Sequence, residues 1–241
     1  VPFADVHIHF NWDQQEVTAA AEAAAALRRQ DVALAVVSST PTRLALTLAE
    51  AAGEGGIPLF SPYITETSRR DWFLDERVLR EAEAGLGSGR YGGIGEVHFM
   101  AGFPPRTDNA IFKGLVALAR RFEVPMLLHV DASSPDYFLA ICRPHPEVAM
   151  LLAHAGGIYG PAAIREILTA CPNVMVEFSA RDPWRYGGLT DADGQLLPGW
   201  RSLIEAYPHR FMTGTDPVWG VTRTQRWDQP DEGWDHYAEL I

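Results

Sequence analysis

The sequence contains no apolar run long enough to cross a membrane. A spanning helix needs roughly 20 consecutive apolar residues, and the most Ala-rich stretch, residues 19–26, is interrupted by Glu22 and followed by Arg28 and Arg29. We therefore expect a soluble protein of the cytoplasm without a membrane partner. The chain starts with Val1 rather than Met, which leaves its localisation open.

Basic residues are also scarce. Lys and Arg number 20 against 31 Asp and Glu, giving a formal net charge of −11. Nucleic acids and anionic membrane surfaces are bound through clustered Lys and Arg, so this charge argues against a nucleic-acid partner. The expected partner is a small-molecule substrate, and a homo-oligomer remains open.

Cysteine is limited to Cys142 and Cys171. Two cysteines are too few for a disulfide framework. Each lies near the end of a predicted helix, so a single bridge is conceivable if those helices are neighbours. Free buried thiols are nevertheless the expectation from the sequence.

What the sequence does contain is a series of short apolar runs separated by helical patterns. The runs are dense in Val, Ile, Leu and Met without polar alternation, which is typical of parallel strands covered on both faces. Predicted strands lie at 4–10, 32–38, 57–64, 92–98, 125–130, 148–154, 173–178 and 210–216. Predicted helices lie at 16–30, 42–53, 76–86, 109–122, 135–142, 161–170 and 199–206.

Strands that alternate with helices in this way predict an α/β fold, a single-domain (β/α)8 TIM barrel over residues 1–241. The final residues, 234–241, read as a helix cut short, so we expect the barrel to be incomplete there. An open doubly wound sheet is the alternative, but no Gly-rich dinucleotide turn follows the first strand. The long connections 99–108 and 179–198 leave C-terminal strand ends, where barrel enzymes bind their substrates.

The first apolar run, "ADVHIHF" at residues 4–10, places two histidines at strand spacing. Residues i and i+2 of a strand point to the same side, so His7 and His9 face one direction. Either histidine alone is more simply explained as a core residue. As a pair they are candidates for metal ligands, because imidazole is the commonest metal-binding side chain, provided that further ligands come from elsewhere.

Further polar residues stand at the C-terminal ends of four other predicted strands. Charged groups at the mouth of an apolar barrel carry a desolvation cost unless they are paired or metal-bound. With the histidine pair they make four imidazoles and two carboxylates, more than one tetrahedral zinc needs and suited to two ions with a carboxylate between them. Six unrelated structural residues are the alternative, which this regular placement disfavours. The four are Glu96, His129, His154 and Asp216.

This arrangement resembles the amidohydrolase superfamily of metal-dependent hydrolases over essentially the whole chain. "ADVHIHF", "LLAHAGG" and "TGTDP" look most similar to its amidohydrolase-related branch, whereas "GIGEVH" is also similar to the TatD family. The resemblance implies that His7, His9 and Asp216 bind one metal, that His129 and His154 bind a second, and that Glu96 bridges them. Binuclear members often have a carboxylated Lys on strand four instead of Glu96, so occupancy by one metal remains open.

The resemblance implies a hydrolase that cleaves an amide, ester or lactone bond of a small organic substrate through a metal-activated water. Asp216 is the expected catalytic residue, because its carboxylate can take up a proton and return it to the leaving group. Zinc is the first choice of metal, with Mn, Co, Ni or Fe open. The alternatives are a TatD-like phosphodiesterase or nuclease, a mononuclear-metal decarboxylase, and a metal-binding barrel without catalysis.

Substrate contacts are expected from side chains that follow these strand ends. Arginines of the two long connections can pair a substrate carboxylate bidentately, which makes Arg106 and Arg185 further candidates, with local salt bridges as the alternative. Aromatic side chains there can line a pocket or pack within the loops. The predicted substrate-binding residues are His98, Tyr159, Arg181 and Trp184.

Overall fold

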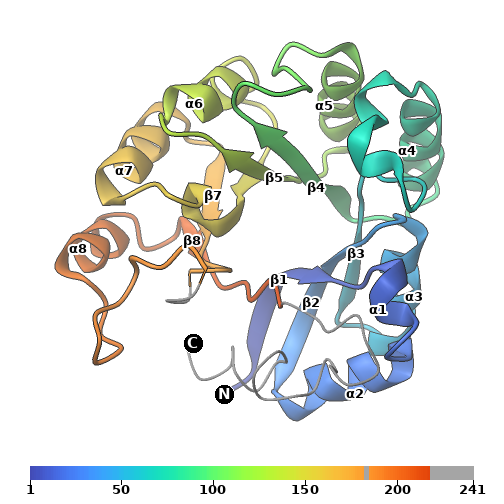
Figure 1. Ribbon diagram of the computed structural model, residues 1–241, viewed down its shortest axis with the longest axis horizontal. Helices are drawn as coiled ribbons and strands as arrows, with labels where there is room; N and C mark the ends of the chain where they lie inside the picture. Colours follow the sequence, from blue (N-terminus) through green and yellow to red (C-terminus); the bar gives the residue numbers. More distant parts are fainter. Residues whose placement is uncertain (182–184, 218–241) are drawn as a thin grey trace.

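Eight parallel strands form one ring in the computed structural model, which describes residues 1–181 and 185–217 (Figure 1). Each strand pairs with the next along the chain, in the order β1 to β8, and the helices lie outside the ring. The predicted TIM barrel is confirmed. The strands are β1 (Phe3–His9), β2 (Val32–Ser38), β3 (Gly56–Phe60), β4 (Gly93–Met100), β5 (Met126–Asp131), β6 (Met150–Leu152), β7 (Val174–Glu177) and β8 (Phe211–Met212).

The helices follow the predicted ranges closely, except at the first of them. The predicted helix 16–30 begins later, as α2, and a separate single turn, α1, precedes it. Within the described ranges no helix is long and apolar enough to cross a membrane. The α-helices are α1 (Trp12–Gln15), α2 (Ala20–Arg29), α3 (Arg43–Ala52), α4 (Arg77–Gly87), α5 (Ala110–Phe122), α6 (Asp136–Cys142), α7 (Pro161–Ala170) and α8 (Pro198–Ala206), and the 3-10 helices are η1 (Ser68–Arg70), η2 (Trp72–Leu74) and η3 (Ala153–Gly156).

Helix α5 shows how sequence, capping and core packing combine. The side chain of Asn109 accepts hydrogen bonds from the backbone N–H groups of Ile111 (2.9 Å) and Phe112 (3.1 Å), which satisfies donors that a helix start leaves unpaired. Ile111, Phe112, Leu115 and their helical neighbours one turn on are buried against the sheet. This apolar stripe holds the helix against the outside of the ring.

The ring closes where β8 meets β1. The N–H of Val6 donates to the carbonyl of Thr213 (3.0 Å), and the N–H of Asp216 donates to the carbonyl of His7 (2.8 Å). Asp5, fully buried, adds a carboxylate that accepts from Thr215 Oγ1 at 2.6 Å. The predicted strand 210–216 is regular only at Phe211–Met212, because the following residues turn to make these contacts.

Two other strands are shorter than predicted. The predicted strand 57–64 ends at Phe60, because Ser61 donates its N–H to Thr42 Oγ1 (3.0 Å) rather than to a ladder, and Pro62 has no N–H to donate. Strand β6 ends at Leu152, so His154 lies in η3 rather than on a strand. Both chain segments leave the barrel at the C-terminal ends of its strands.

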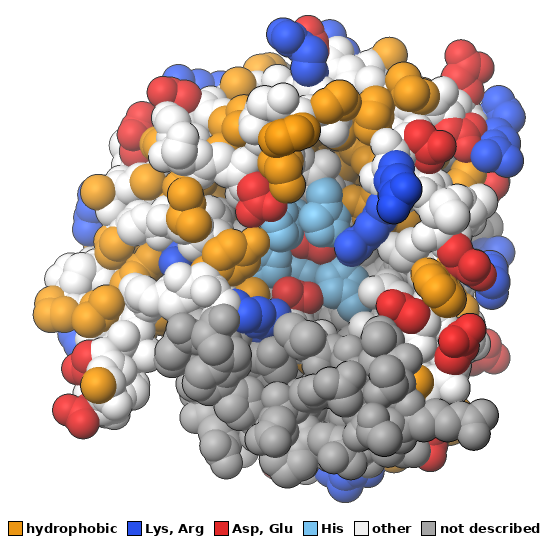
Figure 2. Space-filling model, in the orientation of Figure 1, with side chains coloured by type: hydrophobic (Ala, Val, Ile, Leu, Met, Phe, Trp, Pro, Cys, Tyr) orange, Lys and Arg blue, Asp and Glu red, His pale blue; other side chains and the backbone are white. Residues whose placement is uncertain are grey.

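Histidines gather at this C-terminal end of the barrel. Figure 2, in the orientation of Figure 1, shows their side chains together with carboxylates in a hollow at the centre of the ring. Barrels of this kind carry their active sites at the same end. Trp184 and the predicted C-terminal helix at 234–241 lie outside the described residues.

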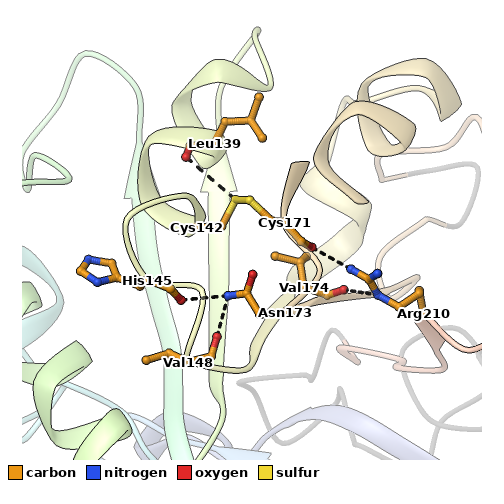
Figure 3. The surroundings of a disulfide bond; sticks show 8 residues. All are labelled: Leu139, Cys142, His145, Val148, Cys171, Asn173, Val174 and Arg210. Carbon is orange, nitrogen blue, oxygen red and sulfur yellow. Dashed lines mark hydrogen bonds between the residues drawn. A yellow bond between two sulfur atoms is a disulfide. The ribbon is translucent and has the colours of Figure 1, made fainter. Parts of the chain in front are cut away.

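The opposite end of the barrel is crosslinked. Cys142 and Cys171 form a disulfide with a Cα–Cα distance of 6.1 Å (Figure 3), so the expectation of free thiols was wrong. The reason is topological: Cys142 ends α6 and Cys171 directly follows α7. Helices of successive βα units run side by side in a barrel, so their ends meet. Both cysteines are buried.

Candidate metal centre

All six predicted metal ligands come together at the mouth of the barrel. They come from β1, β4, β5, η3 and the segment after β8, separated by up to about two hundred residues of sequence. Their side-chain nitrogens and oxygens form overlapping groups in which all ligand atoms lie within 4.8 Å of one another. Two of these groups are His7, Glu96 and His154, and His7, His9 and Asp216; a third contains Glu96, His98 and His129.

Glu96 stands between two sets of imidazoles. Its Oε2 lies 3.5 Å from His7 Nε2 and 3.2 Å from His9 Nε2. Its Oε1 lies 2.9 Å from His129 Nδ1 and 3.4 Å from His154 Nε2. Each oxygen of one carboxylate therefore faces a different histidine pair, which is the arrangement of a carboxylate shared by two ions.

The backbone of β4 is shaped to deliver Glu96 to this position. Gly95 has φ +148°, and a Cβ there would lie 2.6 Å from both Cβ and the carbonyl oxygen of Leu127, so only glycine fits. The ladder between β4 and β5 shifts register over the same residues. The N–H of Glu96 then donates to Ser38 Oγ at 2.6 Å, which anchors it to β2.

Hydrogen-bond partners fix which nitrogen of each buried imidazole faces the centre. His7 Nδ1 lies 2.9 Å from Glu177 Oε1, and His129 Nε2 lies 3.0 Å from Asp131 Oδ2. Since a carboxylate only accepts, these nitrogens carry protons, and the opposite ring nitrogens, which face the centre, can present their lone pairs to an ion bound there. His154 Nδ1 likewise contacts the hydroxyl of Ser179 (2.7 Å). Metal-binding histidines characteristically have such partners.

Glu177, at the end of β7, was missed by the sequence analysis. It is fully buried, and besides His7 it accepts from the N–H groups of His154 (2.8 Å) and Ser179 (2.6 Å). Its carboxylate approaches Gly214 so closely that a Cβ there would lie 2.6 Å from Oε2. The sequence does contain a signal for this residue, because Glu177 is an ionisable residue at the C-terminal end of an apolar predicted strand, as the predicted metal ligands are.

His154 reaches the centre through a strained turn. Its φ is 56° and that of Ala155 is 47°, both in the left-handed region that non-glycine residues avoid. Arg181 holds this turn: its Nε donates to the carbonyl of His154 (2.9 Å) and an NH2 group donates to Tyr159 (2.5 Å). The buried guanidinium also stacks on Trp200, 5.1 Å from the ring centroid.

The electrostatics of the centre favour a cation. Burial alone would lower the pKa of His7, but the carboxylates of Glu96, Asp216 and Glu177 raise it well above its ordinary value. Burial also acts to lower the pKa of His129, but Glu96 and Asp131 outweigh it and raise this pKa to about 10. Without positive charge among them, these buried carboxylates draw protons onto the imidazoles; a divalent ion supplies that charge directly.

The donor set fits one or two divalent ions. Nε2 of His7 and Nε2 of His9 lie 3.1 Å apart, close to the spacing of about 3.3 Å between two nitrogens on one tetrahedral zinc. Asp216 Oδ1 lies 3.4 Å from the same His9 nitrogen. Two lone-pair nitrogens aimed at one point repel each other unless a proton or a cation lies between them, and the carboxylates nearby suit a cation.

The predicted substrate-binding residues that the structure describes line two different hollows. His98 lines a hollow of about 310 Å³ together with His9, Glu96, His129 and other candidate ligands. Tyr159 and Arg181 line a separate hollow of about 420 Å³ beside the starts of α7 and α8. The hydroxyl of Tyr159 donates to the carbonyl of Ser134 (2.7 Å), and Arg181 is committed to backbone carbonyls, so neither placement favours contact with a substrate at the metal centre.

The two other arginines considered from the sequence also have partners. Arg106 pairs with Asp108 (3.2 Å) in an exposed position. Arg185 NH1 contacts Asp216 twice, at Oδ2 (3.2 Å) and at the carbonyl oxygen (2.7 Å). Arg185 therefore orients Asp216, whose other carboxylate oxygen faces the imidazoles.

The comparisons with known proteins agree with this geometry. Residues 67–240 match the amidohydrolase family, and the chain belongs to that family. It is an enzyme of the amidohydrolase type, with a metal-dependent chemistry for which the histidine and carboxylate cluster is the candidate centre. No curated protein matches the sequence.

Solved structures with the same fold include three enzymes or enzyme homologues. YjjV, a TatD homologue of Escherichia coli K12, has a TM-score of 0.64 at 15% identity, over 99% of this chain and 87% of that one. An amidohydrolase of Burkholderia multivorans with bound HEPES has a TM-score of 0.61 at 20% identity, over 100% and 90%. A 2,6-dihydroxybenzoate decarboxylase has 0.58 at 13%, over 99% and 92%. At these identities the likeness concerns the fold.

Proposed function

We propose that this enzyme hydrolyses an amide, ester or lactone bond of a small organic substrate. The observation that carries the proposal is the position of the Glu96 carboxylate, whose two oxygens face different histidine pairs. One of these pairs also faces Asp216. A shared carboxylate of this kind suits two-ion hydrolysis. The hollow above it, about 310 Å³, is of the size that holds a small molecule.

The residues that would hold the ions are those whose lone pairs face the centre. His7, His9 and Asp216 would hold one, His129 and His154 the other, and Glu96 both; zinc suits this donor set. When bound, such ions supply a nucleophilic water at neutral pH and polarise the oxygen of the scissile group.

Asp216 is the proton acceptor of the proposed reaction. As the water oxygen bonds to the carbonyl carbon, Asp216 Oδ1 takes up the released proton and returns it to the nitrogen or oxygen of the bond that breaks. Arg185, 3.2 Å from Oδ2, holds the carboxylate with Oδ1 toward His9. Glu177, Asp131 and Ser179 hold the imidazoles in orientation meanwhile.

The test is turnover measured beside metal content. Protein stripped with a chelator and reloaded with zinc, manganese or cobalt is assayed on a panel of methyl esters, lactones and amides, with bound metal counted by mass spectrometry in each sample. Turnover that returns with metal supports the proposal. Full metal loading without turnover across the panel contradicts it and supports a metal-binding barrel without catalysis.

Two other reactions are distinguished by the same preparation. Structural likeness to a decarboxylase makes release of carbon dioxide from aromatic acids the assay for that alternative. Likeness to a TatD homologue calls for an assay of DNA cleavage. The net charge of −11 disfavours a polyanionic substrate, and nuclease activity with a steep salt dependence would show otherwise.

A further inference from the structure

His98 is the fifth imidazole beside Glu96, and its hydrogen bonds differ from those of the other four. Its Nε2 lies 3.1 Å from Glu96 Oε2. Its Nδ1 lies 2.6 Å from the hydroxyl of Tyr63. Distance alone would therefore allow His98 to serve as a metal ligand, like His7 or His129.

The hydroxyl of Tyr63 decides between a ligand and a hydrogen-bond donor. It accepts from the backbone N–H of His98 at 3.1 Å, and the Tyr63 side chain is only 1% exposed. Within the described part of the chain, His98 Nδ1 is the acceptor left for the hydroxyl proton. A buried hydroxyl proton left unpaired is destabilising, so Tyr63 donates to Nδ1. In a neutral imidazole the proton must then be on Nε2.

This is the reverse of the arrangement at the metal-facing imidazoles. His7 and His129 each donate a hydrogen bond from their outer N–H to a carboxylate and can turn a lone pair to an ion at the centre. His98 accepts a hydrogen bond at its outer nitrogen, Nδ1, and turns the N–H of Nε2 to the centre. An N–H cannot bind a metal, but it can donate to the bridging carboxylate.

We propose that Tyr63 and His98 are positioning residues that fix Glu96 by a hydrogen-bond chain, from Tyr63 Oη to His98 Nδ1 and from His98 Nε2 to Glu96 Oε2. The chain rests on the proposed two-ion function. It leaves Glu96 a lone pair on each oxygen for the two ions and stops the carboxylate from rotating toward either of them. His98 is excluded from both ligand sets.

The direct test is nitrogen NMR on protein labelled with ¹⁵N-histidine and loaded with ¹¹³Cd. Expected are ¹¹³Cd couplings to Nε2 of His7 and His154 and to Nδ1 of His129. His98 should show a protonated Nε2 and no coupling. A ¹¹³Cd coupling to His98 Nε2 would make it a ligand and overturn the proposal. This readout does not depend on catalytic activity, so it stands even if no hydrolytic substrate is found.

Variants test the positioning role. His98→Gln keeps both a donor toward Glu96 and an acceptor for Tyr63, so two ions should still bind; His98→Leu has neither, and the affinity for the second ion should fall about 10-fold or more. Equal metal binding by these two variants contradicts the proposal. Tyr63→Phe should leave His98 a mixture of tautomers by NMR. Tyr137→Phe is the matched control, because its buried hydroxyl has no partner in the described ranges.

A separate observation concerns charge in the hollow. Arg69, in η1 between β3 and α4, lines it together with His9, His98 and Asp216. Its guanidinium lies 5.3 Å from the centroid of the Tyr63 ring. Among residues 1–181 and 185–217 Arg69 has no ion-pair partner, whereas Arg106 and Arg185 each contact an aspartate.

A guanidinium packed on a ring, without a carboxylate of its own and facing the hollow, is suited to an anionic ligand. We infer that Arg69 binds a carboxylate of the substrate, so that the substrate class is an acid carrying the scissile bond a few atoms away. Asp13 also lines the hollow, and its Oδ1 accepts from the N–H of Gln14 at 3.0 Å. This inference rests on the proposed function, whose substrate it specifies.

The test compares matched esters. Methyl hydrogen succinate carries a carboxylate beside its ester, and dimethyl succinate is neutral. The wild type should prefer the acid, and Arg69→Met should lower that preference in kcat/KM by about 10- to 100-fold, the effect of one charged hydrogen bond. Arg70→Met removes a neighbouring exposed charge outside the hollow and should keep the preference.

Failure of the inference and failure of the function give different results. Equal hydrolysis of both esters by the wild type keeps the hydrolase and overturns the role of Arg69. If neither ester is hydrolysed, calorimetry of succinate binding to zinc-loaded protein decides: binding that Arg69→Met weakens and Arg70→Met does not supports the subsite. Binding that is unchanged in Arg69→Met overturns it.

Discussion

The two ends of this barrel are stabilised in opposite ways. The C-terminal end buries groups that are costly in an apolar interior, and it satisfies them with one another: His7, Glu96, His154 and Glu177 are each at most 2% exposed. The N-terminal end instead has a disulfide between Cys142 and Cys171. Chemistry that needs buried charge is thus confined to one end, and covalent stabilisation to the other.

Backbone strain separates the two ends in the same way. Of the described non-glycine residues with positive φ, four lie at the C-terminal end: His154, Ala155, Ala180 and Asp216. The other two, Asp31 and Glu123, precede strands at the N-terminal end, and Glu123 is simply the C-cap of α5. Residues with left-handed backbone terminate helices at the N-terminal end of the barrel, whereas at the C-terminal end they lie among the candidate metal ligands, and strain of this kind is typical of functional sites.

The largest effect at the functional end is expected from Asp216→Asn. The Asn carbonyl oxygen can replace one ligand atom, while His7 and His9 remain, so metal content should fall modestly. A neutral amide does not take up a proton near neutral pH, so turnover should fall by about 10²- to 10⁴-fold. Turnover and metal are measured on the same sample, with exposed Asp108→Asn as the control. Loss of turnover merely in proportion to metal would assign the proton to another group.

Glu177→Gln should weaken metal binding without changing any ligand. Within residues 1–181 and 185–217 the hydrogen-bonding groups that face this carboxylate are donors: His7 Nδ1, the N–H groups of His154 and Ser179, and the Ser179 hydroxyl. The NH2 group of the Gln side chain would face one of these donors without an acceptor between them, and His7 would lose the carboxylate that fixes its tautomer. We expect metal affinity to fall about 10- to 100-fold in chelator competition. Exposed Glu166→Gln on α7 is the control, and equal affinities in the two variants would contradict the role of Glu177.

Glu96→Gln should change the number of ions. The amide keeps the volume and one acceptor, but it loses the charge that holds two cations close together. Wild type is expected to bind up to two ions and the variant about one, counted by mass spectrometry after dialysis. Unchanged stoichiometry would show that Glu96 does not bridge.

The sequence predicted the candidate ligands that the fold brings together better than the residues that orient them. Regular placement at strand ends identified all six clustered residues, because the closing of a barrel brings equivalent positions together. Glu177 obeys the same rule and was missed. Tyr63 and Asp131 act through hydrogen bonds across the mouth, and the left-handed turn at His154 depends on Arg181 from another loop. Loop conformations of this kind are set by tertiary contacts that no local pattern encodes.

Removing the disulfide should affect stability and leave the metal centre unchanged. The bridge closes a sequence separation of 29 residues, for which the chain-entropy model gives roughly 3 to 4 kcal/mol of unfolding free energy. Cys142→Ala with Cys171→Ala should lose about this amount in denaturant unfolding. Metal-free protein is used throughout, because bound metal adds its own stabilisation.

Reductant is the control for these two substitutions. It should destabilise wild type and have no effect on the double variant, which separates loss of the bond from loss of packing by two buried side chains. Metal content and turnover, measured on native protein, should be the same in wild type and in the double variant, since the bridge lies before the starts of β6 and β7 and the candidate ligands lie at the opposite ends of the strands. If reduction releases metal instead, the two ends are coupled through these strands, and the separation of chemistry from covalent stabilisation fails.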